Sequence, residues 1–141
     1  MVNWDRKILG QEFSHQVEHI TRETLLDFAA LMETTNPIYL DPQAARAQGY
    51  DDIIALSTFV LVRGATPLVP PELDFHGMGI NAGYDCRFDA VIYPDDILTF
   101  STCLIDMYEK TGRSGIMRFV VRETTITNQH GKSDDLEAAE Q

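Results

Sequence analysis

The first half of the chain carries apolar residues at helical spacing. A helix is predicted over 21–32, with Thr21 as its N-cap and Asn36-Pro37 beyond its end. A second, short helix should follow Asp41-Pro42 and close at Gly49. A third, apolar nearly all round and therefore expected to be buried, is predicted from about Ser57 to Leu68. The first helix has one apolar face, formed at i, i+3, i+4 and i+7 by Leu25, Phe28, Ala29 and Met32.

The second half changes to a period of two, which is typical of strands. A strand is predicted over 85–92, where one side carries Cys86, Phe88, Ala90 and Ile92. Further strands are predicted over 97–107 and 116–127, and an earlier one over 13–20. Turns are indicated at 94–96, 110–112 and 128–131. Helices followed by a meander of long strands predict an α+β domain.

Length and charge narrow the possible partners. The 141 residues suit one domain, and the formal net charge of -11 argues against nucleic acid or an anionic membrane as a partner. No apolar segment approaches the ~18 residues of a membrane span, so a cytoplasmic location is expected. Residues 1–131 are predicted to form the domain. The acidic residues 132–141 are predicted to form a solvated, disordered tail.

The cysteines, histidines and glycines do not indicate a metal or nucleotide site. Cys86 and Cys103 lie in apolar stretches outside any CxxC pair, so buried, reduced thiols are expected. The glycines at 77, 79 and 83 precede a strand rather than a helix, which argues against a phosphate-binding loop. We therefore expect no cofactor and no metal. The histidines are expected to be solvated or in loops: His15, His19, His76 and His130.

One segment carries a specific motif. The run Thr34-Thr35-Asn36-Pro37-Ile38-Tyr39-Leu40-Asp41 resembles the motif G-D-x-N-P-x-H-x-D of the MaoC-like hydratases, with matches at Asn36, Pro37 and Asp41. The likeness continues through the alanine-rich second helix, the apolar segment from Ala55 and the turn at 94–96, and it covers the chain to about residue 131. This resemblance implies a hot-dog fold, in which an antiparallel sheet wraps around a central helix.

The resemblance also implies a reaction and shows what this chain lacks for it. MaoC-like enzymes interconvert 2-enoyl and (R)-3-hydroxyacyl thioesters of coenzyme A or acyl carrier protein. An acid and an imidazole share one water, and a backbone N–H polarises the carbonyl. Here the acid position holds Thr34, the imidazole position Tyr39, and a family serine position Ala65. A threonine hydroxyl accepts no proton near neutral pH, and a tyrosine with a pKa of about 10 is a poor base.

The binding positions survive better than the catalytic ones. The glycine that offers the carbonyl-binding N–H is replaced by Ser57, whose backbone N–H can still serve. We therefore predict a substrate-binding set without an assigned catalytic residue. Phosphates of coenzyme A could meet Arg63, Arg113 or Arg118. The residues predicted to bind substrate are Asn36, Tyr39, Ser57, Asn81 and Gly83.

Three functional hypotheses follow. In the first, the chain is the non-catalytic half of a dimeric hydratase, pairing with a copy of itself or with a MaoC-like subunit that supplies the acid and the histidine. In the second, it is a hydratase on its own in which Tyr39, His76 or Glu33 takes a new role. In the third, it is a hot-dog thioesterase, with Asp41 or Glu33 facing the substrate, or a binding module for acyl thioesters.

Overall fold

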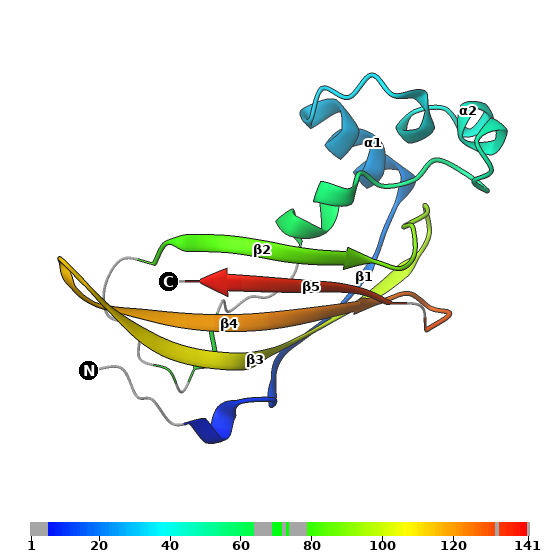
Figure 1. The fold of residues 1–141 in the computed structure, drawn as a ribbon. Coiled ribbons are helices and arrows are strands. Elements are labelled where there is room, and N and C mark those ends of the chain that lie inside the picture. The colour runs from blue at the N-terminus through cyan, green and yellow to red at the C-terminus, as the bar shows by residue number, and fades with distance from the viewer. Residues whose placement is uncertain (1–5, 64–68, 72, 74–78, 132, 141) are drawn as a thin grey trace.

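The computed structural model describes residues 6–63, 69–71, 73 and 79–131, together with the backbone of 133–140. One five-stranded sheet has the order β1-β3-β4-β5-β2, and all neighbouring strands are antiparallel. β3 and β4 form its long central hairpin, and β1 and β2 are the two edges (Figure 1). The strands are β1 (Glu12–His19), β2 (Asn81–Phe88), β3 (Ile97–Gly112), β4 (Gly115–Thr127) and β5 (Ser133–Glu140).

The helical segments gather at one end of the sheet, except for a short N-terminal turn, η1 (Figure 1). The predicted caps are confirmed: Thr21 caps α1 by accepting from the N–H of Thr24, and Asp41 caps α2 by accepting from the N–H of Gln43. The elements are η1 (Arg6–Ile8), α1 (Arg22–Leu31), η2 (Pro37–Tyr39), α2 (Pro42–Ala47) and η3 (Ser57–Val62). Among the described residues, no helix is long and apolar enough to cross a bilayer.

The core lies on one face of the sheet in two apolar clusters. In the first, Phe28 of α1 meets Phe59 of η3 edge-on, and both pack with Phe100 of the sheet. The second, toward the N-terminal turn, contains Leu73, Leu104, Met107 and Val120. A hydrogen bond of 2.8 Å joins the buried hydroxyls of Thr102 and Thr124 on this face and satisfies both of them. The α+β architecture predicted from the periodicity is confirmed.

Several predicted bounds are wrong. The buried helix expected from Ser57 to Leu68 is a 3-10 helix ending at Val62, and its remainder lies outside the described residues. Valine and threonine side chains, stiff at χ1, weaken an α-helix there. β2 ends at Phe88, so Ala90 and Ile92 lie in the following loop. β3 continues through the turn expected at 110–112, because its pairing with β4 extends to Gly112 opposite Gly115.

The prediction of a disordered tail is also wrong. Ser133–Glu140 forms β5, which pairs with β4 from Thr127 to Val120 and with β2 from Phe88 to Asn81. The backbone groups of two neighbouring strands, which would otherwise be left unpaired, outweigh the low strand propensity of the acidic residues. The acidic segment is therefore the last strand of the sheet.

Candidate functional site

The motif segment forms a capped turn that ends with Tyr39 directed at a hollow. The side-chain oxygen of Asn36 accepts from the N–H of Ile38 at 3.2 Å, and the N–H of Tyr39 donates to the Asn36 carbonyl at 3.2 Å. Asn before Pro favours such a turn because its short side chain bonds the backbone two residues on. The N–H of Asp41 closes the turn onto the Pro37 carbonyl at 2.8 Å. Asn36 therefore shapes the turn that carries Tyr39.

Three segments far apart in the sequence meet behind this turn and enclose a cavity of about 130 Å³. The N–H of Ile54 donates to the Ile38 carbonyl at 3.3 Å, and the N–H of Ala55 donates to the Ile92 carbonyl at 2.9 Å. The predicted residues Tyr39 and Ser57 both line the cavity. Its other walls are Ile54, Ala55, Leu56, Val60, Phe88, Ala90, Val91 and Ile92.

The chemistry of the cavity is almost entirely apolar. Among the described residues that line it there is no carboxylate, imidazole, lysine or arginine. The described lining residues with a hydroxyl group are Tyr39 and Ser57. Ser57 is the first residue of η3, and the leading N–H groups of a helix have no partner within it. The site can hold an acyl chain and donate hydrogen bonds, but these residues offer no base for activating water.

The other described residues that were candidates for catalysis lie outside the cavity. Glu33 adopts a φ of 54° at the end of α1, where the next N–H, that of Thr34, bonds the Ala29 carbonyl at 3.2 Å. Glu33, Thr34 and Asp41 are not among the residues that line the cavity. The thioesterase hypothesis requires Asp41 to face the substrate. Its carboxylate instead caps α2. Ala65 and His76 lie outside the described residues.

The predicted binding residues do not all come together. Asn36 borders a separate, more polar hollow of about 290 Å³ with Gln48 and Tyr50. Asn81 and Gly83 lie at the start of β2, whereas the cavity is at its other end, beside Phe88. The side-chain oxygen of Asn81 accepts from the N–H of Gly83 at 2.9 Å. Their role in substrate binding stays a prediction.

The loop 90–92 contributes cavity walls, although the alternation of its residues predicts a continuing strand. The apolar run before Pro94 is the signal in the sequence for this wall. The turn after it is pinned by buried Asp96, whose side chain accepts from the N–H of Tyr93 at 2.9 Å and from the Gln129 amide at 2.9 Å. This carboxylate fixes the loop rather than facing the cavity.

An ion pair supports the opposite wall. The two terminal guanidinium nitrogens of Arg22 on α1 donate to Asp52, at 2.9 and 2.5 Å, and Asp52 also accepts from the N–H of Ile53 at 2.7 Å. The hydrogen bond from Arg22, followed by that from the Ile53 backbone, lowers the pKa of Asp52 against the opposing effect of burial. The pair ties α1 to the segment that leads into the cavity wall.

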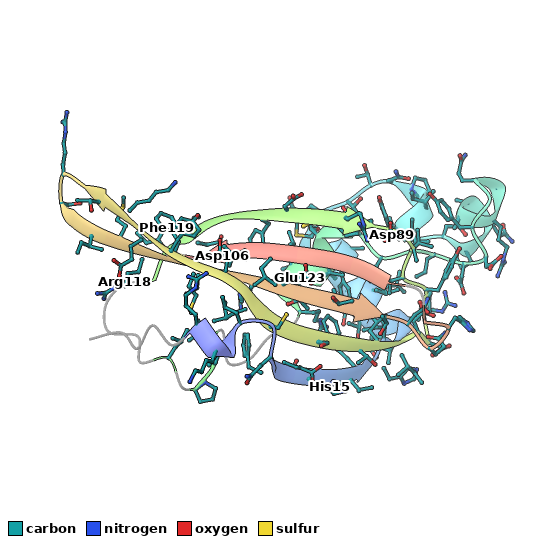
Figure 2. All side chains as sticks on the ribbon, turned by 60° about the horizontal axis from the view of Figure 1, so that its bottom comes forward. His15, Asp89, Asp106, Arg118, Phe119 and Glu123 are labelled. Atoms are coloured by element: carbon teal, nitrogen blue, oxygen red, sulfur yellow. The ribbon has the colours of Figure 1, made fainter. Side chains whose placement is uncertain are left out.

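Arg63 and the two histidines of β1 make contacts outside the cavity. Arg63 pairs with Glu18 at 3.0 Å and lies over the Phe59 ring, 5.1 Å from its centroid. His15 and His19 are exposed on β1, and contact Glu12 at 3.1 Å and Asp95 at 3.2 Å, respectively. Figure 2 shows His15 at the β1 edge of the sheet, away from the helices.

Both thiols are free. Cys86 and Cys103 are half-buried rather than fully buried, and burial is the main cause that raises the pKa of each.

The sequence over residues 7–133 matches the family described as FAS1-like, dehydratase domain region. The chain belongs to this family. A UPF0336 protein of Thermobifida fusca is 29% identical over 115 residues, covering 77% of this chain and 75% of that protein. A UPF0336 protein of Clavibacter michiganensis is 46% identical over 43 residues, and this match covers 30% of the present chain and spans only 29% of that relative's length.

Solved structures confirm the hot-dog fold and the resemblance to MaoC-like hydratases. The (R)-hydratase PhaJ1 of Pseudomonas aeruginosa is 25% identical, with a TM-score of 0.70 and coverage of 94% of this chain and 79% of that one. The ChsH1–ChsH2 complex of Mycobacterium tuberculosis gives a TM-score of 0.75 at 15% identity, covering 94% and 96%. The HadBC (3R)-hydroxyacyl-ACP dehydratase complex of the same organism gives 0.71 at 18% identity, covering 95% and 97%.

Proposed function

We propose that this member of the dehydratase family is the non-catalytic, acyl-binding half of a dimeric enzyme that hydrates 2-enoyl thioesters or dehydrates (R)-3-hydroxyacyl thioesters. One observation carries the proposal: the cavity beside the family motif keeps an apolar wall and hydrogen-bond donors, but its described lining contains no acid or imidazole. Hydration needs a group that takes a proton from water while another gives one. Tyr39 and Ser57 can position a thioester but cannot perform that exchange near neutral pH.

The edge strand β2 supports a partner chain, because no strand lies beyond it in the part of the chain that the structure describes. β2 is an edge strand, and its Tyr84 and Phe88 side chains are 45% and 46% exposed. Phe88 also lines the cavity, so a chain that pairs with β2 would reach the cavity wall. Exposed edges of this kind are normally covered, because their free backbone groups invite pairing. The ChsH1–ChsH2 and HadBC complexes, whose names join two subunits, are consistent with a heteromeric partner that brings the catalytic acid and histidine.

The carrier of the acyl group and the cellular compartment are part of the same proposal. The substrate is an acyl thioester of coenzyme A or acyl carrier protein, because that is the chemistry for which the family motif is built. A cytoplasmic location is supported by the two free thiols, which suit a reducing compartment.

The test is hydration of crotonyl-coenzyme A by the purified chain, alone and co-expressed with a MaoC-like subunit that retains the aspartate and histidine. We expect background rates from the chain alone and robust turnover from the pair. Tyr39→Phe in the pair should raise KM with less effect on kcat, because it removes a hydrogen bond that positions the thioester and no group that exchanges a proton with water. A turnover number of order 10 per second from the chain alone, typical of enzymes, would contradict the non-catalytic assignment.

A further inference from the structure

The β3–β4 hairpin carries a surface that the hydratase chemistry does not use. Residues 108–119, here called the basic hairpin, project from the sheet at the end opposite the helices (Figure 1). The pairing of β1 with β3 stops at Cys103, and that of β5 with β4 stops at Val120. Beyond these points the described β3 and β4 pair with each other alone, around the turn at Arg113–Ser114.

Side-chain contacts stiffen this two-stranded ribbon on both faces. On one face the rings of Tyr108 and Phe119 stack, with centroids 4.8 Å apart and planes 8° from parallel, and the Lys110 ammonium lies 5.6 and 5.5 Å from the two centroids. On the other face Arg118 donates to Glu109 at 2.9 Å. Figure 2 shows Phe119 and Arg118 on opposite sides of the ribbon in this part of the hairpin. Cross-strand pairs of these kinds are the unit by which strands stabilise each other.

The charge of the basic hairpin is opposite to that of the rest of the molecule. It carries Lys110, Arg113 and Arg118 against the single acid Glu109, so the other residues hold eight basic and twenty-one acidic side chains. Ile116 beside the turn is 62% exposed. Arginine, tyrosine, phenylalanine and methionine, all present here, are the types enriched in protein interfaces.

The shape of the basic hairpin selects the class of ligand. Sites for small molecules are concave and bury most of the ligand, whereas a projecting ribbon presents a convex surface. A cationic, partly apolar, convex and stiffened surface fits an acidic protein better than a free nucleotide. We propose that the basic hairpin docks an acidic acyl carrier protein. This rests on the proposed function, in which the chain handles acyl thioesters.

Its position suits delivery to a second subunit. If the free edge of β2 pairs with the same edge of a partner about a two-fold axis, the two strands run antiparallel. The helical end of the partner, which holds its cavity, then lies at the same end of the joined sheet as the basic hairpin of this chain. A carrier docked on one chain would therefore present its acyl group to the site of the other.

The experiment is a calorimetric titration of the purified full chain with unacylated acyl carrier protein at about 50 and 300 mM salt. We expect saturable binding that weakens about tenfold or more at the higher salt, because steering by rim charges is screened. Lys110→Glu with Arg113→Glu should weaken binding at least about tenfold. Lys7→Glu with Arg46→Glu makes the same change in net charge at exposed positions elsewhere and should change the affinity less than about twofold. Thermal unfolding of both variants checks the fold.

Three outcomes would overturn the docking proposal. The first is no binding of the carrier at low salt, and the second is an equal loss of carrier affinity in the two double variants. The third is binding of free coenzyme A that is lost in the hairpin variant alone, because this would indicate a phosphate site. Hydration of crotonyl-coenzyme A by the two-subunit complex reports separately on the proposed function. A working complex without carrier binding refutes the docking surface alone, and carrier binding without hydration refutes the hydratase assignment alone.

Discussion

At the scale of single residues, Thr34 and Tyr39 separate binding from catalysis. Tyr39 lines the cavity, whereas Thr34 lies outside it and its hydroxyl accepts from the N–H of Asn36 at 3.4 Å. An aspartate introduced at position 34 would therefore not lie beside a water molecule bound near residue 39.

We predict that Thr34→Asp with Tyr39→His restores little hydration of crotonyl-coenzyme A in the isolated chain. Catalytic groups must be held within about 0.5 Å of a productive geometry, and no supporting acid or amide contacts the new pair among the described cavity residues. Initial rates of the double variant are compared with those of each single variant. Rates far above those of both single variants would show that the supporting scaffold is intact and that two residues alone were lost.

The Arg22–Asp52 ion pair predicts a dependence of stability on pH. The folded state lowers the pKa of Asp52 below the ordinary value of 3.8, so its stabilisation is present above that value and is lost as pH falls through the lowered pKa. Because the Arg22 side chain is nearly half exposed, Asp52→Asn should cost no more than about 1 kcal/mol at pH 7.

Urea unfolding of the wild type and of Asp52→Asn from pH 7 down to about pH 2 measures this difference. The two curves should converge below about pH 4. Asp27→Asn, an exposed carboxyl on the same helix, is the control and should follow the wild type throughout. A constant gap between wild type and Asp52→Asn at every pH would show that the loss comes from packing and not from ionisation.

At the scale of elements, local chemistry predicted more than periodicity did. The caps at Thr21 and Asp41 and the turn at Asn36 follow from short side chains bonding the backbone within three residues, so the sequence alone determines them. β5 could not be found in this way, because its pairing groups come from β4 and β2. The cavity was predicted in part: the motif indicated Tyr39 and Ser57, but the loop at 90–92 reaches the site only through tertiary contacts.

The assignment of β5 is tested by Leu136→Pro. This residue pairs with Cys86 on one side and Thr124 on the other, so proline removes a donor inside the sheet and should cost about 3 kcal/mol or more of unfolding free energy. Leu136→Val is the matched control and should cost less than about 1.5 kcal/mol. Denaturant unfolding followed by circular dichroism gives both values. If the proline variant unfolds like the wild type, residues 133–140 contribute no strand to the stable sheet.

At the scale of the whole molecule, an acidic chain with two exposed aromatic residues on an edge strand should dimerise in a salt-dependent way. Two chains of net charge -11 repel each other, but ~0.15 M salt screens exposed charges beyond about 8 Å. Burial of a standard interface of roughly 1,600 Å² outweighs the repulsion that is left. Light scattering after size exclusion should report at least twice 15.9 kDa at micromolar concentration, with tighter association at higher salt.

Tyr84→Lys on β2 should weaken the dimer and Tyr84→Phe should not, because a lysine on an edge strand opposes pairing. Carrier binding at the basic hairpin should respond to salt in the opposite sense, so one salt series measured on both processes separates the two surfaces. A chain that stays monomeric at every salt concentration would rule out pairing of β2 with a second copy of itself.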